Sequence, residues 1–124
     1  MLPTRLSQEL SEIDGAFDVE AHEEATVVDL IFRNFPTSAH YSLPTTTILL
    51  RVPKSYPDAG LDMFWTDVEL ALANGGVPQG AGAIESYMGR SWRRFSWHHG
   101  SWNPNVHNLH TYLDFVRRRF RESN

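Results

Sequence analysis

The chain has 124 residues, of which 41% are hydrophobic and 12% aromatic, and this size and composition suit one domain with one core. It contains no cysteine, which excludes disulfides, thiolate metal sites and any mechanism that passes an acyl group through a sulfur atom of this chain. The formal net charge is −4, so nucleic acid is not an expected partner. We predict a single domain over residues 1–124.

The sequence shows no targeting or membrane-spanning signal. The first 14 residues lack a basic leader followed by an apolar segment. No stretch elsewhere approaches the roughly 18 apolar residues that span a bilayer. We therefore expect a cytoplasmic protein that does not bind membranes.

Charge is distributed unevenly along the chain. Residues 1–75 hold 12 acids and 4 bases, whereas residues 76–124 hold 3 acids and 7 bases. Such asymmetry is typical of ordinary solvated faces. The alternative interpretation is an electrostatic docking surface for an acidic partner.

The first two thirds of the chain predict one helix and several strands. Apolar residues at helical spacing between residues 2 and 13 predict a short leading helix. β-Branched and aromatic residues then predict four strands, over residues 17–20, 26–34, 45–52 and 61–66. Glycine and proline dominate residues 74–82, which predicts a loop long enough to carry a site.

A long amphipathic helix is predicted over residues 105–121. Asn103 is a good helix cap, and Pro104 is favoured at the first helical position. Apolar residues then recur at steps of three and four, at Val106, Leu109, Leu113, Val116 and Phe120. The economical arrangement is an α+β fold, in which an antiparallel meander of about four strands carries both helices on one face.

Three short motifs occur in a fixed order along this pattern. They are Tyr56-Pro57 after the third strand, residues 63–65 (MFW) at the end of the fourth, and residues 102–104 (WNP) before the last helix. In order and spacing they resemble the ubiquitin-conjugating (UBC) fold over roughly residues 3–121. The blocks 56–58, 61–67 and 89–98 are similar to a bacterial UBC-like group called family E.

The resemblance implies partners as well as a fold. Members of that group sit in gene neighbourhoods with ubiquitin-like proteins, activating enzymes and JAB-type peptidases. These three kinds of protein are therefore the partners that the resemblance implies, with no cofactor expected.

The chain departs from ordinary UBC enzymes at each part of their thioester machinery. Residues 60–61 (GL) replace paired prolines, and residues 69–72 (ELAL) replace the His-Pro-Asn element whose asparagine stabilises the oxyanion. The position of the catalytic cysteine falls near residues 94–96 (RFS). We therefore expect a chain that forms no thioester itself.

Candidate catalytic residues are Ser96, close to the expected cysteine position, and His98 as its base. On one strand the two side chains would share a face. The alternative is that Ser96 is a polar strand residue and His98 is structural. A metal site is not expected, although His107, His110 and Asp114 fall at positions i, i+3 and i+7 of the predicted helix and are weak candidate ligands.

Arg90, Arg93 and Arg94 surround the position where a transferred carboxyl terminus would lie, so they are candidates to bind a partner. Ordinary surface charge is the alternative. Trp65 and Trp102 are expected in the core, whereas Trp97 is the ring most expected to be exposed and to bind a partner.

Three functions follow from these residues. The leading hypothesis is a UBC-fold component of a bacterial ubiquitin-like modification system, which binds the ubiquitin-like protein or its activating enzyme without thioester chemistry. The second is a noncanonical conjugating enzyme that uses Ser96 or His98. The third is a small metal-dependent hydrolase built on His98, His107 and His110.

Overall fold

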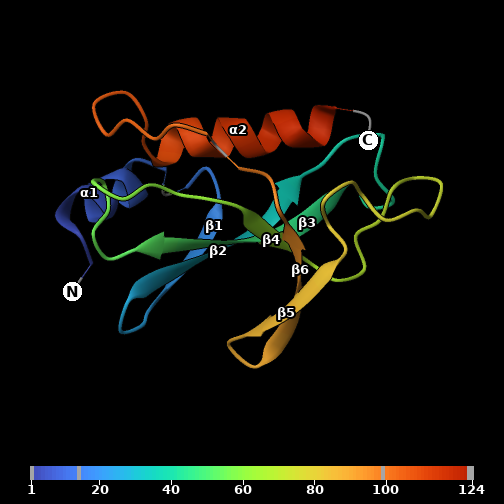
Figure 1. Ribbon diagram of the computed structural model, residues 1–124, viewed down its shortest axis with the longest axis horizontal. Coiled ribbons are helices and arrows are strands. Elements are labelled where there is room, and N and C mark those ends of the chain that lie inside the picture. The colour runs from blue at the N-terminus through green and yellow to red at the C-terminus, as the bar shows by residue number, and fades with distance from the viewer. Residues whose placement is uncertain (1, 14, 99, 123–124) are drawn as a thin grey trace.

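Two helices cover one side of an antiparallel sheet (Figure 1). The computed structural model describes residues 2–13, 15–98 and 100–122. The helices are α1 (Thr4–Ile13) and α2 (Leu109–Arg121). The strands are β1 (Asp18–Glu23), β2 (Val27–Pro36), β3 (Thr45–Pro53), β4 (Phe64–Thr66), β5 (Ala83–Tyr87) and β6 (Arg90–Phe95). Neither described helix is long and apolar enough to cross a membrane.

Within the described ranges the sheet has six strands, in the order β1-β2-β3-β4-β6-β5, so the expected count of about four is wrong. The extra pair is the β5–β6 hairpin, in which Tyr87 pairs with Arg90. Its turn holds Met88 and Gly89 at φ 54° and 76°. Two-residue hairpin turns need this left-handed backbone, which asparagine and glycine usually supply. Because methionine is unusual at the first turn position, the sequence gives no signal for this hairpin.

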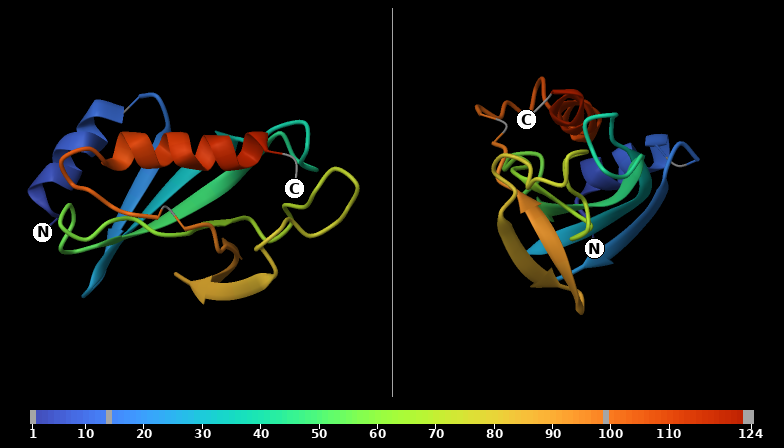
Figure 2. Two further views of the ribbon diagram at one scale, coloured as in Figure 1. Left: turned by 45° about the horizontal axis from the view of Figure 1, so that its top comes forward. Right: turned by 90° about the vertical axis from the view of Figure 1, so that its right-hand side faces the viewer.

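The main core lies between the helices and the sheet, as the α+β prediction requires (Figure 2). The alternation of β2 sends Val28, Leu30 and Phe32 to this face, where all three are fully buried. Helix residues Leu6, Val116 and Phe120 are likewise fully buried in it. Each helix therefore buries one apolar stripe against the same face of the sheet.

Helix α2 begins at Leu109, so the predicted start near residue 105 and the predicted cap at Asn103 are wrong. The cap is Asn108, whose side chain accepts a hydrogen bond from Thr111 N, while Thr111 Oγ1 accepts from Asn108 N. This reciprocal pair satisfies two backbone donors at one place. Val106 therefore precedes the helix and is 61% exposed, instead of belonging to its apolar stripe.

The buried carboxylate of Glu9 ties α1 to α2. Arg5 Nε donates to its Oε2 at 2.9 Å, and Leu109 N donates to its Oε1 at 3.1 Å. The Tyr56 hydroxyl also donates to Oε1. The pKa of the Tyr56 hydroxyl lies above its usual value, mainly because the group is buried and secondly because it donates to Glu9. A buried carboxylate is costly unless it is paired, and three donors satisfy this one. The bond from Leu109 N is the one of the three that joins α1 to the start of α2.

The opposite face of the sheet carries a smaller apolar cluster of Leu49, Trp65 and Trp92. Trp65 is buried, as predicted, but in this cluster and not in the main core. Trp102 is half-buried and packs against the main core. Strand β6 contributes to both layers, because Trp92 faces the small cluster and Phe95 faces the helices.

Candidate functional site

Ser96 and His98 follow β6, which ends at Phe95, so they do not share a strand face as the catalytic hypothesis assumed. The hydroxyl of Ser96 accepts a hydrogen bond from Arg94 Nε at 3.0 Å. Its backbone N donates to Gly80 O at 2.9 Å. Across the described ranges, no hydrogen bond joins Ser96 to His98. The alignment of nucleophile and base that serine chemistry needs is therefore not formed there.

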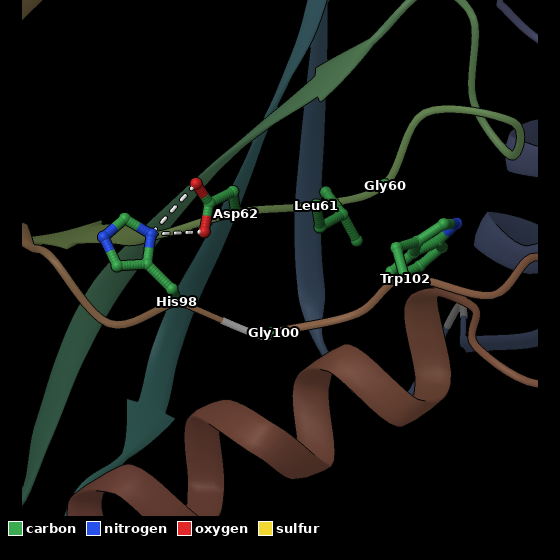
Figure 3. A pocket seen from close by; sticks show the side chains of 6 residues that line it. All are labelled: Gly60, Leu61, Asp62, His98, Gly100 and Trp102. Carbon is green, nitrogen blue, oxygen red and sulfur yellow. Dashed lines mark hydrogen bonds and ion pairs between the residues drawn. The ribbon is translucent and has the colours of Figure 1, made fainter.

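His98 instead pairs with Asp62 (Figure 3). Its Nδ1 lies 2.9 Å from Asp62 Oδ1 and 3.1 Å from Oδ2. The side chains are 66% and 54% exposed, respectively. Since a carboxylate only accepts hydrogen bonds, we assign the proton to Nδ1, which leaves Nε2 as an exposed basic nitrogen.

This pair stands at the edge of a shallow hollow of about 310 Å³ (Figure 3). Asp62 belongs to the connection from β3 to β4, and His98 to the connection from β6 to α2. The described residues that line the hollow are Gly60, Leu61, Asp62, His98, Gly100 and Trp102. They bring together one carboxylate, one imidazole and an indole, without a lysine or arginine.

The back of the hollow depends on close packing between Gly60 and Trp102. A Cβ at Gly60 would lie 2.2 Å from two ring carbons of Trp102, so only glycine fits. Trp102 Nε1 donates to Pro57 O at 2.8 Å, and its ring centroid lies 6.0 Å from that of Tyr56. The glycine that replaces the usual proline is thus required by the indole it faces. The Tyr-Pro motif, which has a cis peptide bond, and the Trp-x-Pro motif are in direct contact.

The three candidate arginines divide between the two faces of β6. Arg90 and Arg94 lie on the face away from the helices, where they pair with Asp67 and Glu85, respectively. Arg93 lies on the helix side, and donates to the carbonyls of Val68 and Ala81. Arg93 therefore stabilises loops, and the three guanidinium groups form no single surface.

Trp97 is half-buried and lies on the helix side. Its ring centroid is 6.4 Å from that of Phe115, and the guanidinium carbon of Arg119 lies 4.7 Å above it. Arg119 itself is buried, and it donates to Tyr41 and to Gln79 O. One face of Trp97 is thus occupied by α2, which leaves only part of its ring for a partner.

The weak metal candidates are not arranged as the predicted helix required. His107 precedes α2, where its Nδ1 accepts from Asn103 N at 2.9 Å. His110 contacts Glu12 at 2.7 Å, and Asp114 accepts from Arg117 at 2.6 Å. The structure contains no group of three or more His, Asp or Glu that could hold a metal ion within residues 2–13, 15–98 and 100–122.

Asp62 is the residue of this site that sequence reasoning missed. It lies 36 positions before His98, so no local spacing relates the two. The only available signal was its place in the block 61–67, which resembled family E. The pairing depends on β4 lying beside β6, a contact formed only in the folded chain.

The fold combines a four-strand meander, a Tyr-Pro turn and a Trp-x-Pro element before a long helix, as in E2-like proteins of the UBC fold. The sequence matches prokaryotic E2 family E over residues 2–123, so the chain belongs to that family. The resemblance drawn from the motifs is thereby confirmed. No curated protein and no solved structure matches the chain. Membership of an E2-like family indicates a role in a bacterial ubiquitin-like modification system, with ubiquitin-like proteins and activating enzymes as general partners.

Proposed function

We propose that this chain is a docking component of such a system, which binds a ubiquitin-like protein or its activating enzyme in the cytoplasm and carries no thioester itself. The observation that supports this role most directly is an E2-like chain with no cysteine. A JAB-type peptidase is a further proposed partner.

The surroundings of Ser96 favour docking over serine chemistry. An alcohol has a much higher pKa than a thiol and needs a well-aligned base to attack a carbonyl. Ser96 accepts from a guanidinium, which is a permanent donor, and its hydroxyl has no described basic partner. The group nearest to the expected cysteine position therefore lacks the means of activation.

The face of β6 away from the helices is the proposed contact for the partner. Arg90 is 42% exposed and stacks on the ring of Trp92 at 3.8 Å, and Arg94 is 32% exposed. Each guanidinium group now pairs with a carboxylate of this chain, and each can pair instead with a carboxylate of a partner protein. Trp97, on the helix side, is a second proposed contact that is independent of the first.

The docking role is tested by mixing the purified chain with the ubiquitin-like protein and activating enzyme of the same organism, ATP and Mg²⁺. We expect co-elution on size-exclusion chromatography and an unchanged intact mass for this chain. An alkali-labile adduct on Ser96 would refute a role limited to docking. Failure to co-elute with either protein would refute docking itself.

The contact face is tested by charge reversal. Arg90→Glu should weaken binding about three- to tenfold, mainly through the association rate. Arg121→Glu, which reverses an exposed arginine at the far end of α2, is the matched control and should leave affinity unchanged. Equal effects of the two substitutions would show that net charge, and not this face, governs binding. Arg93 is unsuitable because it holds two loop carbonyls.

A further inference from the structure

Strand β1 forms one margin of the sheet, and its outer edge has no neighbouring strand in the described chain (Figure 2). An edge strand leaves the N–H and C=O of every second residue open to a further strand. The pairing with β2 identifies these residues. Glu24 N donates to Val27 O at 2.9 Å, and every second residue back from Glu24 likewise bonds to β2. Val19 and Ala21 therefore direct their backbone groups outward.

A hollow lies beside this edge, between β1 and α1. The described residues that line it are Leu10, Ser11, Val19 and Ala21, and its volume is about 240 Å³. Leu10 and Val19 also pack against the main core, so the hollow is on the helix side of the sheet. Three of the four side chains are apolar, and the hydroxyl of Ser11 donates to Gln8 O. The residues whose backbone is open thus also form a wall of an apolar hollow.

The opposite face of β1 is acidic. Asp18 and Glu20 lie there by alternation, and their side chains are 68% and 40% exposed, respectively. Arg33 lies 2.7 Å from Glu20 and 4.0 Å from Asp18, so it offsets one of the two charges. The hydrogen bonds that Glu20 receives, first from Arg33 and then from His22, lower the pKa of its carboxyl. Residues 17–24 (FDVEAHEE) hold four acids and no lysine or arginine.

We propose that the β1 edge binds an extended segment of a partner protein in which apolar and basic residues alternate. In an added strand, the residues that bond to Val19 and Ala21 turn their side chains to the helix side, where the hollow receives apolar groups. The residues between them turn to the other face, where Asp18 and Glu20 attract lysine or arginine. Backbone bonds supply affinity, and the alternating side chains supply specificity.

The same acidic face disfavours a second copy of this chain as the added strand. Charged side chains on an edge strand oppose pairing between identical strands. Two antiparallel β1 strands would bring Asp18 and Glu20 of both copies onto one face, and like charges on neighbouring strands are destabilising. A basic segment meets no such repulsion, so charge complementarity selects it as the occupant.

This surface is separate from the proposed docking face on β6. β1 is the first strand in the sheet order and β6 is the fifth, so three strands lie between them. A strand added at β1 leaves Arg90 and Arg94 open to another protein. The inference therefore adds a second interaction surface and does not depend on the first.

The probe for the β1 edge is a synthetic peptide with the proposed pattern, acetyl-Gly-Lys-Val-Lys-Val-Lys-Gly-amide. NMR titration of the full chain gives its Kd, and amide hydrogen exchange locates it. At saturation we expect exchange of the Val19 and Ala21 N–H groups to slow by about tenfold or more, because both become hydrogen-bonded. Exchange at Ile84 and Ser86, on the other edge strand β5, should stay unchanged.

Altered peptides test whether binding is strand addition. Methylation of both valine nitrogens removes the donors that face β1, so affinity should fall by about tenfold. Methylation of the central lysine nitrogen, which points away from β1, should leave affinity almost unchanged. Replacing the lysines with glutamate should abolish binding, because the outer face of β1 is acidic.

Variants of the chain test the two faces of β1. Asp18→Lys should weaken peptide binding about three- to tenfold, and the effect should shrink at high salt. Glu69→Lys, which reverses an exposed carboxylate between β4 and β5, is the matched control and should leave affinity unchanged. Ala21→Phe places a ring in the hollow, so affinity should fall by about tenfold. Circular dichroism checks that each variant is folded.

Four outcomes would overturn the inference. They are equal affinity for the lysine and glutamate peptides, equal affinity after methylation at the valines and at the central lysine, protection at Ile84 and Ser86 in place of Val19 and Ala21, and no binding at about 1 mM peptide. Slow exchange at Val19 and Ala21 that depends on protein concentration without peptide would assign the edge to a second copy, and would overturn it as well.

Discussion

Gly60→Ala tests the contact that joins the Tyr-Pro and Trp-x-Pro motifs. The added Cβ would lie 2.2 Å from Trp102 Cγ and Cδ2, well inside van der Waals contact. The added Cβ is fixed to the backbone at residue 60, and the indole of Trp102 is held by its hydrogen bond to Pro57 O. Neither can move without cost. The substitution must displace the ring.

The cost follows from two effects. Overpacking of this kind typically costs about 1–3 kcal/mol. Losing the hydrogen bond from Trp102 Nε1 to Pro57 O adds about 1 kcal/mol. We therefore expect Gly60→Ala to lower the free energy of unfolding by about 2–4 kcal/mol, a large share of the roughly 5–15 kcal/mol of an ordinary domain.

Urea unfolding, followed by far-UV circular dichroism, measures this change as a shift of the midpoint at constant slope. Gly82→Ala is the matched control, because a Cβ there meets nothing within 4 Å. It should be neutral or slightly stabilising. In a Trp102→Ala background the clash is removed, so Gly60→Ala should cost almost nothing. An equal cost in both backgrounds, or a cost no larger than that of Gly82→Ala, would refute the reasoning.

Three further predictions concern stability. Asn108→Ala removes the cap of α2 and should lower the free energy of unfolding by about 1 kcal/mol. Asn105→Ala, in the preceding turn, is the control and should change it by no more than about 0.5 kcal/mol. Urea unfolding measures both. Glu9→Gln should cost about 2–3 kcal/mol, because it weakens the charge-assisted bond from Arg5; a thermal shift no larger than that of a surface glutamate variant would contradict this. Burial, reinforced by Glu24 and opposed by Arg51, raises the pKa of Asp29 from 3.8 to about 6. A carboxyl with a raised pKa binds more protons in the folded state, so its contribution to stability is lost as the pH rises from about 4 to about 6. The stability of wild type relative to Asp29→Asn should therefore fall over that interval in urea unfolding, and a constant or rising difference would contradict the assignment.

The sequence by itself determined the α+β class, the first four strands and the family. These features depend on local periodicity and on short motifs, such as Tyr56-Pro57, that are readable in any conformation of the chain. The start of α2 was misplaced because Asn103-Pro104 is a good local signal, yet the capping box at Asn108 and Thr111 satisfies two backbone donors together. The β5–β6 hairpin was missed because its left-handed turn residue is Met88.

Only the tertiary structure decided which polar residues meet. Asp62 and His98 pair because β4 lies beside β6, and the separation of 36 residues along the chain gives no periodic signal of that contact. Likewise, Arg90 and Arg93 look equivalent in sequence, but the alternation of β6 sends one to an exposed ion pair and the other to loop carbonyls. Side-chain direction and long-range neighbours are properties of the folded sheet, and they determine where chemistry or binding takes place on this E2-like scaffold.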